Sequence, residues 1–196
     1  KQKFPKLMFV FKMFPIGVTY MEYILTLDNK VIRFINKNMR SPLLDKIMRF
    51  VTRLGNGGFV WITLAVSLIL MGGERKKMGW LMLGSLGIES AACNLVIKPV
   101  VGRVRPFDEH NMEITINKPK DYSFPSGHTA ASFAAAVSYY LSDRKHGKAA
   151  IAGAIAMGFS RIYLLVHYPT DVICGAILGI VSALSVHEIY KKKSSK

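Results

Sequence analysis

Three polar residues lie within one of the most apolar parts of the chain. Residues 160–171 contain Arg161, His167 and Asp171 among leucine, isoleucine, valine and tyrosine. Ionisable groups in such surroundings are costly and mostly functional. A Tyr-Pro pair between the histidine and the aspartate disfavours a continuous helix, so the two side chains can meet across a corner. A carboxylate bonded to one ring nitrogen would leave the other nitrogen free as a nucleophile. A helix-capping Asp171 beside an interfacial histidine is the alternative.

A second group, Pro125-Ser126-Gly127-His128, opens another apolar run. Free backbone amides at a helix start bind anions, and Gly127 would let a ligand approach the backbone. Ser126 can add a hydroxyl donor, and His128 can exchange a proton near neutral pH. The alternative is an ordinary helix cap with a locally bonded histidine.

The third group is cationic and lies at the boundary of an apolar run. It contains Lys98 and Arg105, with Arg103 between them, whose role stays open. Taken alone, such residues are also typical of side chains that reach from an apolar span to the interface. Together, the three groups supply two histidines, a carboxylate, cations and a helix start. This combination is suited to binding and transferring phosphate.

The elements that carry these groups are apolar runs separated by short basic clusters. Hydrophobic residues make up 51% of the 196 residues, the mean hydropathy is +0.26, and the longer runs approach the roughly 20 residues of a bilayer crossing. We predict an all-α, polytopic membrane helical bundle of six transmembrane helices, forming a single domain over residues 1–196. The predicted spans are residues 7–27, 59–71, 78–97, 125–141, 149–166 and 171–190.

Residues 28–58 alternate charged residues with apolar ones at helical spacing. Ser41-Pro42 fits a helix cap followed by proline in the first turn. We expect an amphipathic helix on the membrane surface after the first span. An interfacial helix is the alternative for residues 7–27, since charged residues and a proline interrupt that run.

Polar and small residues also occur inside the predicted spans. Glu89 lies in the third, where a functional role and a structural partnership with a neighbouring helix are both open. Gly175 and Gly179 in the sixth predict close helix packing. The two cysteines, Cys93 and Cys174, form neither a disulfide framework nor a metal site.

The distribution of the net charge of +15 indicates an orientation. The basic residues lie in short clusters, which favours a multi-pass cell-membrane protein over one that binds nucleic acid. The clusters at residues 74–77 and 143–148 and both termini fall on one side if the number of spans is even. That side is predicted to be cytoplasmic, which places the three chemical groups at the external face.

The three groups, in this order, resemble the signature of the type-2 phosphatidic acid phosphatase family of integral membrane lipid phosphatases, in its bacterial form. The pattern is Lys, six residues, Arg-Pro; then Pro-Ser-Gly-His; then Ser-Arg, five residues, His, three residues, Asp. The resemblance covers about residues 54–190, and the matching positions are Lys98, Arg105, Pro106, Pro125, Ser126, Gly127, His128, Ser160, Arg161, His167 and Asp171.

The resemblance implies phosphoryl transfer without a metal or another cofactor. His167 would form a phosphohistidine, Asp171 would orient it, and His128 would protonate the leaving oxygen and then activate water. The phosphate oxygens would be held by Lys98, Arg105, Ser126, Gly127 and Arg161.

The implied substrates are lipids in the membrane: undecaprenyl diphosphate, phosphatidylglycerol phosphate or phosphatidic acid. An external site would suit recycling of a carrier lipid diphosphate during envelope synthesis. The particular lipid, the preference for monoester or diphosphate, and the oligomeric state stay open. The alternatives are a lipid-to-lipid phosphotransferase and a non-enzymatic phosphate-binding membrane protein. Soluble vanadium-dependent haloperoxidases share a similar pattern, but the predicted spans argue against one.

Overall fold

The computed structural model describes residues 15–195, with side chains from Glu22 onward, and no β-strand occurs in this part of the chain. The all-α prediction is therefore confirmed over these residues. The helices are α2 (Pro15–Asn38), α3 (Pro42–Leu54), η1 (Asn56–Gly58), α4 (Phe59–Met71), α5 (Gly73–Ala91), η2 (Ala92–Ile97), α6 (Lys98–Val101), α7 (Pro106–Glu109), α8 (Gly127–Ser142), α9 (Arg144–Tyr163) and α10 (Pro169–Ser194).

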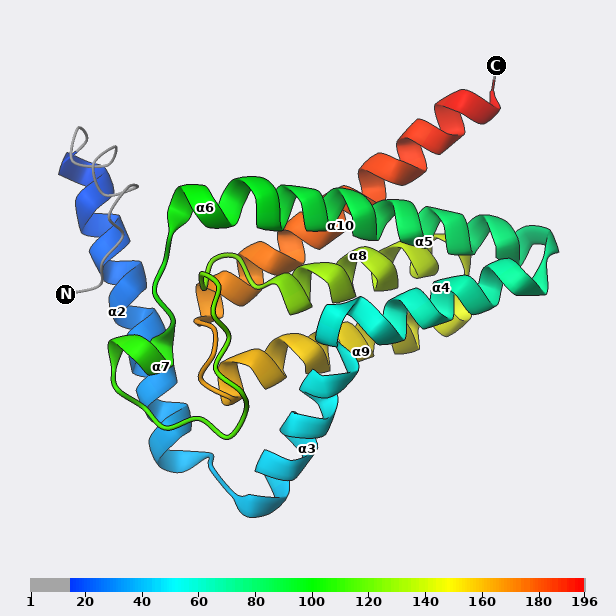
Figure 1. Cartoon of the computed structure of the whole chain (residues 1–196). Helices are drawn as coiled ribbons and strands as arrows, with labels where there is room; N and C mark the ends of the chain where they lie inside the picture. Colours follow the sequence, from blue (N-terminus) through cyan, green and yellow to red (C-terminus); the bar gives the residue numbers. More distant parts are fainter. Residues whose placement is uncertain (1–14, 196) are drawn as a thin grey trace.

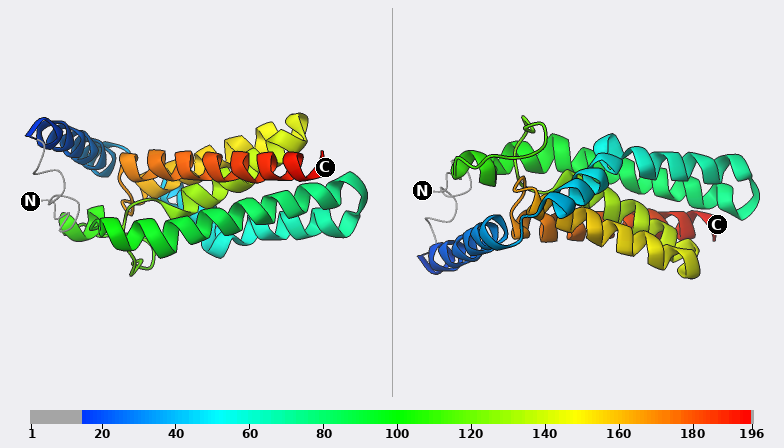
Figure 2. Two further views of the ribbon diagram at one scale, coloured as in Figure 1. Left: turned by 90° about the horizontal axis from the view of Figure 1, so that it is seen from above. Right: turned by 90° about the horizontal axis from the view of Figure 1, so that it is seen from below.

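Five helices, α4, α5, α8, α9 and α10, run side by side as an elongated bundle (Figures 1 and 2). α8 lies at its centre and packs against α5, α9 and α10. Small residues make this possible, since α8 buries Ala130, Ala134, Ala135 and Ala136 completely. Across from them, Gly179 of α10 leaves no room for a side chain against the α8 backbone. The close packing predicted from the glycine spacing is confirmed.

The two ends of the bundle differ in chemistry. At one end lie the α4–α5 turn, the α8–α9 turn and the C-terminal end of α10, and at the other lie the three motif stretches (Figure 1). The basic clusters at residues 74–77 and 143–148, predicted as connections between helices, lie mostly in the first helical turns of α5 and α9. α5 begins at Gly73, and both Gly73 and the preceding Gly72 have positive φ. α9 begins at Arg144, where the Asp143 side chain accepts from two backbone amides.

Only some of the predicted spans are long and apolar enough to cross a membrane. Among the described residues, two helical runs qualify, Gly73–Glu109 and α10, and α3 with Asn56–Met71 forms a third candidate bent by 48°. At about 1.5 Å per residue, α4 and α8 are shorter than the hydrocarbon core of about 30 Å. α9 carries charged residues near both ends. Six spans thus remain a prediction.

The predicted first span, residues 7–27, lies partly outside the described residues. From Pro15 onward, the helix does not end near Leu27 as expected but continues as α2 to Asn38. α2 lies across the motif end of the bundle rather than along it (Figures 1 and 2), and it is not among the candidate spans.

The surface helix predicted to follow is α3. It is shorter than the segment from which it was predicted, and its cap is confirmed, because the Ser41 hydroxyl accepts from the Leu44 amide at 3.3 Å. Leu43, Ile47 and Phe50 are exposed along one face of α3. This face suits an apolar membrane surface.

The third predicted span changes its helical geometry before it reaches the motif. α5 passes into a π-helix over Ala92–Ile97, and Lys98 then begins α6. Insertions of this kind are frequent at functional sites. α6 extends past the predicted end at Lys98 and ends at Val101. Gly102, which follows it, adopts a left-handed conformation with φ of 63°.

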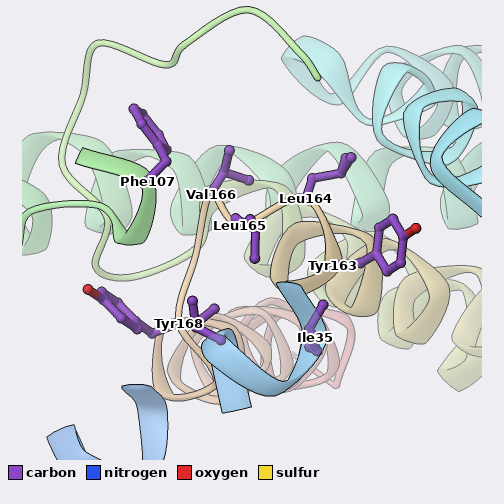
Figure 3. Close-up of a cluster of buried hydrophobic side chains, with 8 residues drawn as sticks. Ile35, Phe107, Tyr163, Leu164, Leu165, Val166 and Tyr168 are labelled. Carbon is purple, nitrogen blue, oxygen red and sulfur yellow. The ribbon is translucent and has the colours of Figure 1, made fainter. Parts of the chain in front are cut away.

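A buried apolar cluster supports the corner between α9 and α10 (Figure 3). Ile32 and Ile35 of α2 and Phe107 of α7 pack against residues 163–166 and 168. Leu165, at the turn of the corner, has a φ of 61°. Its side chain is completely buried, so the corner is enclosed by its neighbours. The cluster thus packs around the backbone on both sides of His167.

Candidate active site

A cavity of about 620 Å³ opens at the motif end of the bundle. Its lining includes six predicted site residues that come from the three motif stretches of the chain: Lys98, Arg105, Gly127, His128, Arg161 and His167. The other two predicted residues, Ser126 and Asp171, are fully buried and are not part of the lining. The fold therefore brings the three sequence motifs together around one space.

His167 is held in the corner after α9 and is 1% exposed. Its Nε2 lies 3.1 Å from Arg105 Nη1, and its Nδ1 lies 3.6 Å from Asp171 Oδ2. A guanidinium can only donate, so Nε2 must accept, which places the ring proton on Nδ1, facing the carboxylate. Nδ1 has no hydrogen-bond partner among the described residues. Burial, together with the positive charges of Arg105, Arg161 and Lys98, holds the pKa of His167 well below its ordinary value of 6.5. The imidazole is thus neutral, with its lone pair on Nε2.

Asp171 is fixed from several directions. Its Oδ2 accepts from Ser123 Oγ at 2.5 Å and from the Tyr168 amide at 2.9 Å. Its carbonyl oxygen accepts from the Ser126 amide at 3.0 Å. The last bond joins the start of α10 to the start of α8, so the predicted helix start and the predicted His–Asp pair are one connected unit.

His128 faces the turn between α3 and α4. Its Nε2 donates to Asn56 Oδ1 at 3.0 Å. Asn56 also lines the cavity. The sequence around Asn56 indicated only a glycine-rich break, so this contact could not be found from it.

The three predicted phosphate cations are all nearly buried, with exposures of 7% for Lys98, 4% for Arg105 and 3% for Arg161. Arg105 donates from Nη1 to the Val166 carbonyl at 2.7 Å, while Arg161 donates from Nη1 to Thr52 Oγ1. Arg161 Nε has no partner within the described residues. The lining of the cavity thus carries three cationic side chains.

Asp121, which sequence reasoning missed, bonds to two of these cations. Its Oδ1 accepts from Arg105 Nη2 at 2.7 Å, and its Oδ2 accepts from Lys98 Nζ. Partial burial acts to raise the pKa of Asp121, but the hydrogen bond from Lys98 and the charges of Arg105 and Lys98 hold it well below its usual range. Asp121 lies in a polar loop and has no spacing signal that would single it out.

The Ser126 side chain does not line the cavity, and its role in binding phosphate stays a prediction. Its hydroxyl bonds to Thr129 Oγ1 at 2.9 Å and is fully buried at the start of α8. Gly127, by contrast, lines the cavity. The backbone at the helix start therefore faces the cavity, while the serine side chain is engaged within its own helix.

A second cavity of about 520 Å³ adjoins the first and shares Lys98, Asp121, Gly127 and His128 with it. It extends between α4 and α5 along apolar residues that include Ile62, Leu83 and Leu86. Glu89, whose role the sequence left open, also lines it. Its side chain is 2% exposed, and Oε1 has no hydrogen bond within residues 15–195.

Comparisons with known proteins agree with this arrangement. A model of the PAP2 superfamily matches residues 78–195. Undecaprenyl-diphosphatase BcrC of Bacillus subtilis is 32% identical over 141 residues, covering 72% of each chain. An undecaprenyl-diphosphatase of Sulfolobus acidocaldarius is 34% identical over 160 residues, covering 80% of this chain and 76% of the relative. The crystal structure of a PAP2-type phosphatidylglycerolphosphate phosphatase from Bacillus subtilis superposes with a TM-score of 0.73 at 26% identity, covering 96% of both chains.

Proposed function

The chain belongs to the PAP2 superfamily, and we propose that it is a membrane lipid phosphatase that uses His167 as its nucleophile. The observation that carries the proposal is the state of His167. Its neutral ring directs the Nε2 lone pair toward Arg105 on the cavity wall and Nδ1 toward Asp171.

In the first step, an oxygen of the bound phosphate takes over Arg105 Nη1 from Nε2 of His167. The freed Nε2 lone pair then attacks the phosphorus of the lipid phosphate in line with the leaving oxygen. The N–P bond forms as the P–O bond to the lipid breaks. His128 donates a proton to that oxygen, so the lipid leaves as an alcohol or, from a diphosphate, as a monophosphate. The ring of His167 gains positive charge, which Asp171 stabilises across 3.6 Å.

In the second step, His128 accepts a proton from water, whose oxygen attacks the phosphorus. The N–P bond breaks, phosphate leaves, and His167 is restored. Because the same residue gives and then takes a proton, the cycle closes without another proton carrier.

The cations of the cavity support both steps by binding the non-bridging oxygens. Phosphoryl transfer depends mainly on positioning and charge stabilisation, and arginine forks match phosphate geometry. Lys98, Arg105 and Arg161 supply three positive charges on the cavity wall. Within the described residues, no group of three or more His, Cys, Asp or Glu side chains could hold a metal ion. We propose that the reaction is metal-independent.

The substrate we propose is a prenyl diphosphate of the undecaprenyl type. Two relatives at 32% and 34% identity are undecaprenyl-diphosphatases, and the apolar cavity between α4 and α5 gives a lipid tail a path away from Lys98. Phosphatidylglycerol phosphate is the second candidate, because the structural neighbour acts on it.

We further propose the predicted orientation, with six membrane crossings, cytoplasmic termini and an external site. The basic first turns of α5 and α9 and the basic end of α10 lie at the end of the bundle opposite the cavity (Figure 1). Excess Lys and Arg favours the cytoplasmic side.

The test is phosphate release by the purified protein from undecaprenyl diphosphate, phosphatidylglycerol phosphate and phosphatidic acid, each in excess EDTA. Undecaprenyl diphosphate should be hydrolysed fastest, and His167→Ala should abolish release. His146→Ala is the matched control, since His146 is exposed at the opposite end of the bundle. Release by His167→Ala at the control rate would refute the mechanism. Label passing to an acceptor lipid instead of water would identify a phosphotransferase.

A further inference from the structure

Arg103, which belongs to no family motif, lies between two buried carboxylates. Its Nη1 donates to Asp171 Oδ1 at 2.6 Å, and its Nη2 donates to Asp28 Oδ2 at 2.7 Å. The exposures are 3% for Arg103, 1% for Asp28 and 0% for Asp171. We call these three residues the Asp28–Arg103–Asp171 cluster. It joins α2, the loop after α6 and the start of α10.

The cluster fixes the backbone next to Asp171 as well as its side chain. Asp28 Oδ1 accepts from the Thr170 amide at 3.0 Å, and Asp28 Oδ2 accepts from the Thr170 hydroxyl. Arg103 Nη1 also donates to Thr170 Oγ1 at 2.8 Å, and its guanidinium lies 3.9 Å from the centre of the Tyr168 ring. The residues on either side of Pro169 are thus held by groups from α2 and the loop after α6.

The formal charge of the cluster is −1, because two carboxylates share one guanidinium. A pair of Arg103 and Asp171 alone would be neutral. Arg103 bonds to Oδ1 of Asp171, while Oδ2 remains directed at Nδ1 of His167. A charge of −1 therefore lies beside the ring that becomes positive when His167 is phosphorylated. Buried charges interact strongly because little water screens them.

Neither Arg103 nor Asp28 lines the cavity, so neither touches the substrate there. We propose that both are positioning residues: Arg103 holds the Asp171 carboxylate against His167, and Asp28 keeps the cluster at one net negative charge. This inference rests on the proposed function of His167. It also assigns α2 a part in catalysis, although α2 contains no motif residue.

The test compares three variants in phosphate release: Asp28→Asn, Arg103→Gln and the double variant. Asp28→Asn neutralises the cluster and should lower kcat by about 10- to 100-fold, as for residues that orient catalytic metal ligands, without a change in KM. Arg103→Gln leaves two buried carboxylates without the guanidinium that they share and should lower kcat further. The double variant restores the charge of −1, so it should be more active than Arg103→Gln alone.

Asp45→Asn is the matched control. Asp45 of α3 also accepts two hydrogen bonds from an arginine, Arg40, but it accepts a further one from Tyr163 and does not contact Asp171. Asp28→Glu, which keeps the charge, should retain more activity than Asp28→Asn. Competitive inhibition by inorganic phosphate should be unchanged in all folded variants, because the cavity cations remain.

The proposal is overturned if Asp28→Asn behaves like Asp45→Asn, if its loss is entirely in KM, or if the double variant is no more active than Arg103→Gln. If Arg103→Gln does not fold, the proposal is tested by comparing kcat of Asp28→Asn with that of Asp28→Glu. Equal kcat values in these two variants would refute the role of the Asp28 charge. Failure of the proposed function is a separate result, namely phosphate release by His167→Ala.

Discussion

Gly175 offers a test of how closely the site depends on helix packing. It lies one turn after Asp171 on α10, and a Cβ added there would be 2.6 Å from the Ser126 carbonyl oxygen. Ordinary contact begins at 3.4 Å, so Gly175→Ala must separate the starts of α8 and α10 by about 0.8 Å. The same junction contains the 3.0 Å bond from the Ser126 amide to the Asp171 carbonyl. The separation therefore moves His128 relative to Asp171.

A displacement near 1 Å in a reacting geometry can cost about 10²-fold in rate. We expect Gly175→Ala to lower kcat/KM for lipid phosphate by about that factor, measured as phosphate release in detergent. Gly153→Ala is the control, because its Cβ would meet only Trp61 at 3.8 Å. Alanine is favoured over glycine in a helix by about 1 kcal/mol, so Gly153→Ala should keep its activity and melt no lower than wild type. Wild-type kcat/KM and melting temperature in Gly175→Ala would refute the reasoning.

Three further predictions follow from the same geometry. Asp171→Asn should lower kcat by up to about 10⁴-fold, by analogy with tautomer loss in a catalytic triad; a loss under tenfold would contradict the orienting role. The pKa of His167 lies well below 6.5, so the neutral nucleophile persists below that pH. The acid limb of kcat/KM, corrected for substrate ionisation, is expected below pH 6.5, and a limb above it would be inconsistent. In intact cells of a cysteine-free background, a cysteine at Asn111 should react with an impermeant maleimide and one at Lys145 should not; the reverse pattern would invert the proposed topology.

The sequence was sufficient to predict which motif stretches meet, because each carries its chemistry within a few residues. His167 and Asp171 are four residues apart across a proline, and a corner of this kind allows few arrangements. Lys98 follows the end of one apolar run and Gly127 begins the next, so consecutive helices of opposite direction bring them to one end of the bundle. Such local patterns can be interpreted from sequence because the short chain segment between two residues limits how far apart their side chains can lie.

The membrane spans were less predictable because helix ends depend on local backbone chemistry. Gly72 and Asp143 start the following helices earlier than charge alone indicated. α2 continues well past the expected end of the first span because its inner face, which includes Ile32 and Ile35, packs on the site corner. Tertiary contacts of this kind override the apolar run length on which the span was predicted.

Residues that support the site from a distance could not be predicted at all. Asp28 and Arg103 are 75 residues apart, and each alone is typical of a charged residue at the membrane interface. Their significance depends on both being buried against Asp171, because burying an isolated charge is far more costly than burying a paired one. The second carboxylate, that of Asp28, is also stabilised by hydrogen bonds from the Thr170 amide and hydroxyl. We expect the net negative charge of the cluster to act mainly when the His167 ring becomes positive on phosphorylation, which is why the Asp28 variants are compared in kcat.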